Sequence, residues 1–131
     1  MHKMGEKLRI LAVEDEEMVR QVLEGMLRDS YDVDMAECGE DALELMKNNQ
    51  YDLALIDIAL PGRLNGLDLA CRLRKNSPST RIIFLTGLSL PPERQEAVME
   101  LGDDLLQKPF TLEDIEEAVE RVMTEPTTRR A

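Results

Sequence analysis

Carboxylates, a hydroxyl and an amine follow the apolar runs of this sequence, and these are the side chains that could do chemistry. In chain order they are Glu14, Asp15, Asp57, Thr86 and Lys108. Carboxylates held close together repel one another, and a hard divalent cation such as Mg²⁺ relieves that repulsion. A carboxylate beside bound Mg²⁺ can act as a nucleophile toward a phosphoryl group, and an ammonium and a hydroxyl then share the charge of the phosphoryl oxygens.

Each of these residues also has a structural explanation when it is taken alone. The acidic run EDEE suits the start of a helix, where negative charge is favoured. Asp57 could open a turn, Thr86 has the branched side chain of a strand residue, and Lys108 could lay its stem over apolar surface. Their joint placement at the ends of four apolar runs favours the chemical interpretation.

Five short runs predict the strands that would position these side chains. LALI and IIFL are uniformly apolar, which is typical of parallel strands covered on both faces, whereas YDVDMA alternates and suits a strand near an edge. The predicted strands are Leu8–Val13, Tyr31–Ala36, Asp52–Asp57, Arg81–Thr86 and Asp103–Gln107.

Helical patterns separate the strands. Pro91 and Pro92 indicate a helix start, and Thr111 with Asp114 resembles a capping box. The alternation predicts an α/β fold with a doubly wound parallel sheet, whose sites form beyond the carboxyl ends of the strands. One stripe at helical spacing comprises Met18, Val19, Val22, Leu23, Met26 and Leu27, and similar patterns occupy Ala42–Met46, Leu67–Leu73 and Leu112–Val122.

The charge balance excludes several functions. The 131 residues include 16 basic and 27 acidic ones, for a net charge of −11. Direct nucleic-acid binding needs a cationic surface, so neither it nor docking on an anionic membrane is expected. His2 is the only histidine, which excludes a histidine-based catalytic triad, a His-rich zinc site and a histidine phosphodonor.

The remaining sequence signals favour a cytoplasmic location. The first ten residues lack the apolar run of a secretory signal, and no stretch approaches the roughly 18 apolar residues of a membrane span. Cys38 and Cys71 match no zinc or redox motif, so we expect both to be small packing residues in a reduced compartment.

Four segments in family order resemble a two-component response-regulator receiver domain. They are ILAVEDEE, DLALIDIALPG followed by GLDLA, IIFLTG, and LLQKPF. The resemblance covers Leu8 to Met123 and implies a flavodoxin-like (βα)5 fold with a five-stranded parallel sheet in the order 2-1-3-4-5. We therefore expect a leader at 1–7, a receiver domain at 8–123, and a tail or linker start at 124–131.

The resemblance also implies a role for each site residue. Asp57 would be the phosphoacceptor and Asp15 a direct Mg²⁺ ligand, while Glu14 would act through metal-bound water. The backbone carbonyl of Ala59 would be a further metal ligand.

On the same basis, Thr86 would be the switch hydroxyl and Lys108 the amine that pairs with the phosphoryl group. A cis peptide is expected between Lys108 and Pro109, because X-Pro bonds adopt cis at low cost.

Three positions depart from the family pattern. Glu14 stands where an Asp is common, and the loop at 61–66 is one residue longer than the commonest version. Leu105 replaces a frequent Tyr or Phe that rotates with Thr86.

Two further positions bear on the lifetime of the phosphoryl group. In this family, dephosphorylation is influenced by the side chain two positions after the phosphoacceptor and by the one two positions after the switch hydroxyl. Here these side chains are Ala59 and Leu88, and neither is polar.

The predicted function is a phosphorylation switch rather than an enzyme acting on a separate substrate. A histidine kinase or histidine phosphotransfer protein would supply the phosphoryl group, and output would pass to a downstream protein target. One alternative is an Asp-nucleophile, Mg²⁺-dependent phosphatase, although such enzymes usually carry an acid where Ala59 stands. Another is a degenerate receiver that works without phosphorylation. The chain could be a stand-alone regulator or one domain of a hybrid kinase or longer regulator.

Overall fold

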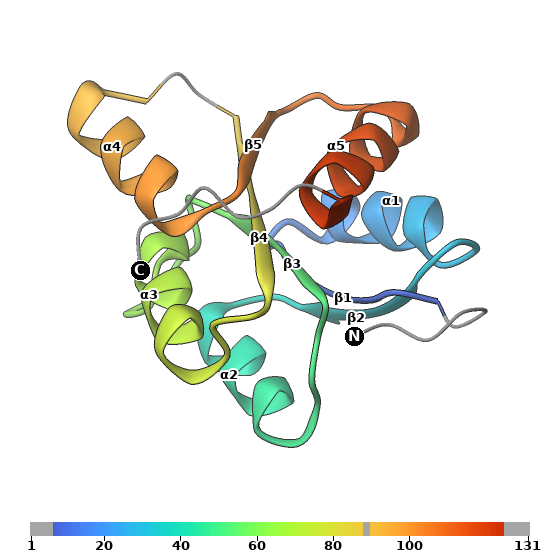
Figure 1. The fold of residues 1–131 in the computed structure, drawn as a ribbon, viewed down its shortest axis with the longest axis horizontal. Coiled ribbons are helices and arrows are strands. Elements are labelled where there is room, and N and C mark those ends of the chain that lie inside the picture. Colours follow the sequence, from blue (N-terminus) through green and yellow to red (C-terminus); the bar gives the residue numbers. More distant parts are fainter. Residues whose placement is uncertain (1–6, 88–89, 125–131) are drawn as a thin grey trace.

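The computed structural model describes residues 7–87 and 90–124, in which five strands alternate with five helices (Figure 1). The chain order of the elements is β1 (Arg9–Val13), α1 (Glu17–Leu27), β2 (Asp32–Ala36), α2 (Gly39–Asn48), β3 (Leu53–Asp57), α3 (Gly66–Asn76), β4 (Arg81–Thr86), α4 (Pro92–Leu101), β5 (Asp104–Gln107) and α5 (Leu112–Thr124).

The strands form one parallel sheet in the order β2-β1-β3-β4-β5, which confirms the predicted flavodoxin-like topology. The alternating strand β2 lies at an edge, as its pattern indicates. Four strands begin one residue later than predicted. At β2 the cause is visible, because the Tyr31 N–H donates to the Leu27 carbonyl and so still belongs to the turn after α1.

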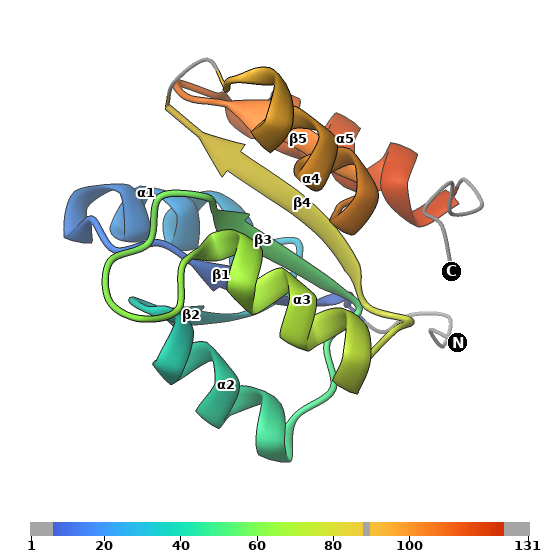
Figure 2. The ribbon, with the colours of Figure 1, turned by 90° about the vertical axis from the view of Figure 1, so that its left-hand side faces the viewer.

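Helices cover both faces of the sheet (Figures 1 and 2). On one face, α1 and α5 pack through residues such as Leu23 and Ile115. On the other, α2, α3 and α4 pack through Ala42, Leu69 and Val98. Both faces of the central strands are thereby buried, which explains their unbroken apolar runs.

The apolar stripe of α1 is wider than its contact with the sheet. Leu23 and Leu27 are fully buried, but Met18 is 79% exposed and Val22 is 52% exposed. Adjacent residues are about 100° apart around a helix, so Met18 and Val22 are turned away from the sheet that their neighbours contact. The apolar stripe seen in the sequence is therefore buried along only part of its width.

The two cysteines differ in environment. Cys38 is partly buried, whereas Cys71 is exposed on α3, so the expectation of a packing role is wrong for Cys71. The helix that carries it buries Leu69, Ala70 and Leu73 instead.

Both predicted helix starts are confirmed. Pro92 is the first residue of α4. Before α5, the Asp114 N–H donates to Thr111 Oγ1 at 3.1 Å, and the Thr111 N–H donates to an Asp114 carboxylate oxygen at 2.9 Å. Among residues 7–87 and 90–124, no helix has the length and apolar character needed to cross a bilayer.

Candidate phosphoryl and metal site

Three carboxylates converge beyond the carboxyl ends of β1 and β3. Glu14 and Asp15 follow β1, and Asp57 is the last residue of β3. One carboxylate oxygen from each lies within 4.8 Å of the other two. Glu14 and Asp57 are buried, while Asp15 is exposed, so the cluster is anchored in the sheet and open to solvent on one side.

Lys108 brings the compensating positive charge. Its Nζ lies 2.7 Å from Glu14 Oε1 and 2.9 Å from Asp57 Oδ2. Burial raises the pKa of the Glu14 carboxyl, and the ammonium only partly opposes this effect. Burial lowers the pKa of Lys108, but the close contacts of its ammonium with the two carboxylates outweigh this effect and leave that pKa raised.

Backbone groups fix the orientation of the carboxylates. The Ala59 N–H donates to Asp57 Oδ1 at 2.9 Å, so both oxygens of Asp57 are engaged, one by Ala59 and the other by Lys108. The Glu16 N–H donates to Glu14 Oε2 at 3.1 Å. These contacts hold the two buried acids in defined positions without filling the exposed side at Asp15.

The end of β5 brings Lys108 to the site. The backbone N–H of Lys108 donates to the Thr86 carbonyl at 2.7 Å, and this bond connects the loop after β5 to the end of β4. The peptide bond between Lys108 and Pro109 is cis, as expected.

Gly66 allows the start of α3 to lie directly beneath the end of β3. A Cβ at this position would lie 2.7 Å from the Ile58 Cα and closer still to the Asp57 carbonyl oxygen, distances that real side chains do not reach. A reciprocal capping box between Asn65 and Asp68 then starts the helix. Only glycine at position 66 allows this close approach, a requirement that sequence reasoning missed.

Arg20 is a second residue that sequence reasoning missed. Its Nη1 donates to the carbonyl oxygens of Glu14 at 3.1 Å and Asp15 at 3.0 Å, and its Nη2 lies 3.5 Å from Glu37 Oε2. Arg20 therefore holds the backbone of the acidic loop. Its position inside a helical pattern carries no motif that would signal this contact.

Thr86 lies at the end of β4, and its side chain is buried. It borders a hollow of about 570 Å³ between β5 and α4 that is also lined by Leu90, Val98 and Leu105. Leu105 is 38% exposed, so the position of the usual aromatic carries a smaller, partly solvated side chain. Leu88 lies outside the described residues.

The donor set fits a hard divalent cation. Carboxylate oxygens are the ligands that Mg²⁺ prefers, and it retains several waters, which suits a cluster with one exposed side. Glu14 Oε1 accepts no hydrogen bond of good geometry, although it is fully buried and close to the Lys108 ammonium. Such a buried oxygen is a natural partner for additional positive charge.

Comparisons with known proteins identify the family and agree with the fold. The model of the response regulator receiver domain family matches residues 10–120. The transcriptional regulatory protein DltR of Streptococcus agalactiae is 38% identical over 109 residues, which cover 82% of this chain and 48% of DltR. Response regulator MprA from a Mycobacterium species is 37% identical over 109 residues, covering 82% of this chain and 47% of MprA.

Solved structures give the same result. The chemotaxis protein CheY4 of Vibrio cholerae superposes with a TM-score of 0.81 at 28% identity, covering 88% of this chain and 98% of CheY4. A CheY-like receiver domain protein from Methanospirillum hungatei gives a TM-score of 0.83 at 26% identity, covering 89% of this chain and 94% of that one.

The chain belongs to the response regulator receiver domain family, the signalling class whose fold it shares. It spans about half the length of the curated relatives it matches.

Proposed function

We propose that Asp57 is the phosphoacceptor of this receiver domain. The observation that carries the proposal is a buried carboxylate with the Lys108 ammonium 2.9 Å from one oxygen and two further acids within 4.8 Å. An Asp57 oxygen attacks phosphorus, the bond from phosphorus to the donor breaks, and the donor atom leaves with the electron pair. The Lys108 ammonium stays beside the transferred oxygens and balances part of their charge.

The metal role of the cluster is part of the same proposal. Glu14, Asp15 and Asp57 would hold Mg²⁺, with the carbonyl of Ala59 as a further ligand. When bound, the ion would neutralise charge on the phosphoryl oxygens. Arg20 supports this role by holding the carbonyls of Glu14 and Asp15, which flank the Asp15 Cα, and thus the direction in which the Asp15 carboxylate projects.

A small phosphodonor tests the phosphoacceptor. Acetyl phosphate with Mg²⁺ should add one phosphoryl group, detected by intact mass, and Asp57→Asn should remove the adduct. Asp52→Asn is a matched control, because Asp52 directly precedes β3, at the end of the strand opposite Asp57, and an amide oxygen can still accept from the Arg9 N–H. An adduct that persists in Asp57→Asn would refute the assignment, and absence of labelling in the unmodified chain would favour the degenerate receiver.

We infer that the natural donor is a phosphohistidine on a histidine kinase or a histidine phosphotransfer protein. Transfer would break the phosphorus–nitrogen bond, and the imidazole would recover its electron pair and take a proton. Mixing with a phosphohistidine phosphotransfer domain labelled with ³²P should move the label to Asp57. Retention of the label on histidine would count against this class of donor.

The output is proposed to be contact with a downstream protein, with Thr86 as the switch hydroxyl. A net charge of −11 disfavours direct contact with nucleic acid. We further propose a receiver domain at 8–123 with a leader at 1–7, in a cytoplasmic protein. Because α5 ends at Thr124, the proposed tail follows that residue. Limited proteolysis should trim both ends and leave this range intact.

A further inference from the structure

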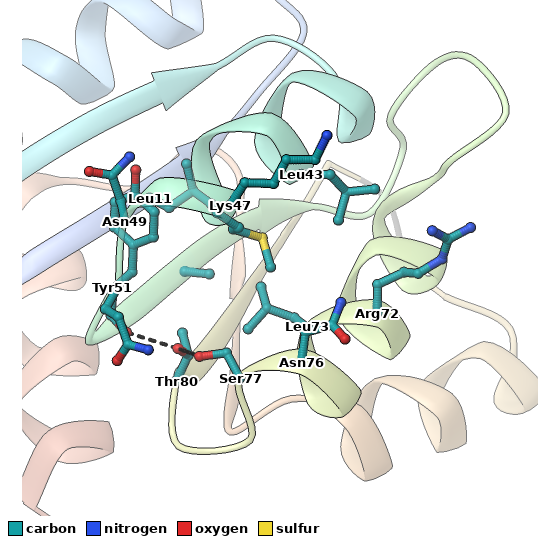
Figure 3. A pocket seen from close by; sticks show the side chains of 13 residues that line it. Leu11, Leu43, Lys47, Asn49, Tyr51, Arg72, Leu73, Asn76, Ser77 and Thr80 are labelled. Atoms are coloured by element: carbon teal, nitrogen blue, oxygen red, sulfur yellow. Dashed lines mark hydrogen bonds between the residues drawn. The ribbon is translucent and has the colours of Figure 1, made fainter.

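A cavity of about 400 Å³ opens between α2 and α3, away from the carboxylate site (Figure 3). Tyr51, two positions before β3, and Thr80, directly before β4, lie at its base, so it belongs to the amino ends of the strands. Asp57 ends the same strand that Tyr51 precedes. The cavity is therefore separate from the site proposed for phosphorylation.

Apolar side chains from the sheet and the two helices line its inner part. Leu11 and Ala54 line it from the sheet, and Leu43, Met46 and Leu73 line it from the two helices. A volume of this size lies within the roughly 300 to 1,000 Å³ of small-molecule pockets, which are mainly apolar with a few polar groups at defined places.

The polar groups at the base already have partners. Thr80 Oγ1 donates to the Tyr51 carbonyl at 2.8 Å and lies 2.7 Å from Ser77 Oγ. The Tyr51 hydroxyl donates to Asp34 at 2.6 Å. These bonds stiffen the base of the cavity, so its inner part favours an apolar group.

The mouth carries positive charge. Lys47 of α2 and Arg72 of α3 both line the cavity, and their charged ends extend outward from its apolar interior (Figure 3). None of the described lining residues is acidic, although the whole chain has 27 acidic and 16 basic residues. Lys47 pairs with Glu44, but both side chains are exposed, and such a pair is weak enough to exchange for a bound anion.

The ends of the helices do not cancel this charge. Both α2 and α3 end beside the cavity, where free carbonyls would favour a cation. Asn49 Nδ2 donates to the Leu45 carbonyl at 2.8 Å, and the Ser77 N–H donates to the Leu73 carbonyl at 2.7 Å. One carbonyl at each end is thereby occupied, and the full positive charges of Lys47 and Arg72 exceed the roughly half negative charge of each helix end.

We propose that this cavity binds a small amphipathic anion, namely a compact aromatic or short aliphatic body that carries one carboxylate or sulfonate. The body occupies the apolar interior, and the acid group lies between Lys47 and Arg72. Inorganic phosphate would leave the interior empty, and a neutral hydrocarbon would make no use of the cations.

The probe for the first experiment is 8-anilinonaphthalene-1-sulfonate, because the chain contains no tryptophan to interfere with its fluorescence. It should bind saturably at one site, with amide NMR shifts confined to the cavity lining, and octanoate should displace it. Lys47→Gln and Arg72→Gln should each raise Kd about threefold to fivefold, the upper part of the range expected for one exposed ionic contact.

Two control variants separate this site from general adsorption. Lys75→Gln removes an exposed cation from α3 that does not line the cavity, and Kd should not change. Asn76→Trp places a large ring at the mouth and should abolish binding while an unchanged Tm shows that the fold is intact. Unchanged Kd in the Lys47→Gln, Arg72→Gln double variant would overturn the proposal, as would binding at several sites or shifts outside the cavity. This double variant decides the matter even if Asn76→Trp does not fold.

Discussion

Nζ of Lys108 lies 2.9 Å from Oδ2 of Asp57, although 51 positions separate the two residues in the chain. Their strands are not neighbours either, because β4 lies between β3 and β5. The lysine follows β5 and reaches past the end of β4 to the buried acid. The contact exists only because three parallel strands end at the same edge of the sheet, and it makes Lys108 the group on which the charge balance of the site depends.

Lys108→Met should destabilise the protein. It leaves the fully buried Glu14 and the nearly buried Asp57 without their cation, at a cost of about 1 to 3 kcal/mol in the free energy of unfolding. Lys75→Met, at an exposed position on α3, is the control and should change stability little. Urea unfolding without divalent metal measures the free energy of unfolding of both variants. Equal values would show that the contacts of Lys108 make no net contribution to stability.

Mg²⁺ should stabilise the fold if the three acids bind it. An ion that binds only the native state adds RT ln(1 + [L]/Kd), about 1.4 kcal/mol at ten times Kd. Asp15→Ala should largely remove this increment, because it deletes the exposed member of the cluster. Thermal unfolding with and without millimolar Mg²⁺ measures the effect, and a Tm indifferent to the ion would contradict the metal site.

Arg20→Gln should weaken Mg²⁺ binding without touching any proposed ligand. It removes the donor to the Glu14 and Asp15 carbonyls, and loss of a group that orients metal ligands typically raises Kd about tenfold or more. Arg28→Gln at the end of the same helix is the matched control. Isothermal titration with Mg²⁺ distinguishes the two variants, and equal Kd values would show that Arg20 only packs.

Both tyrosines should resist ionisation in the native protein. Burial raises the pKa of Tyr31, with Glu116 and Glu120 adding to the effect, and burial with the hydrogen bond to Asp34 raises the pKa of Tyr51. The folded state therefore favours the protonated forms. The contribution of the two tyrosines to stability is complete below their pKa in the unfolded chain, about 10. It is lost as the pH rises through their higher pKa values in the folded protein.

Absorbance at 295 nm checks the tyrosine prediction. Native protein should show little tyrosinate at pH 10, whereas protein unfolded in urea should be about half ionised there. Tyr51→Phe should make the alkaline loss of stability less steep. Native protein that titrates like the unfolded chain would contradict the raised pKa values.

The parallel sheet followed from the regular alternation of the sequence, and its strand order from the family resemblance. The same alternation predicts that the acids after β1 and β3 lie close to Lys108, as they do. The uniformly apolar strands β3 and β4 require cover on both faces, and parallel strands deliver their carboxyl ends to one edge. Asp57 and Lys108 could thus be placed together before any distance was known.

Other features depend on packing that periodicity does not encode. The need for glycine at position 66 arises from its distance to the Ile58 Cα, which only the path of the loop determines. The exposure of Met18 and Val22 depends on how α1 is rotated against the sheet. Arg20 looks like any polar residue of a helix until its side chain is seen to turn back onto the acidic loop.

The phosphoryl group on Asp57 should be long-lived, and Ala59 is one reason. Hydrolysis needs a water aligned opposite the aspartyl oxygen, and such alignment contributes strongly to rate. The Ala59 N–H holds Asp57 Oδ1 at 2.9 Å, but the exposed side chain of Ala59 has no polar atom that could orient water. Leu88, the second position implied by the family resemblance, is also apolar.

Ala59→Asn paired with Leu88→Glu should therefore shorten the phosphoryl lifetime about tenfold, equivalent to about 1.4 kcal/mol of barrier. Ala59→Asn alone should produce part of the effect, because the new amide extends from the residue that already contacts Asp57. Ser79→Asn, an exposed change before β4, should leave the lifetime unaltered. The decay of the phosphorylated mass after removal of acetyl phosphate gives the half-life, and an unchanged value in the double variant with labelling intact would reject this explanation of slow turnover.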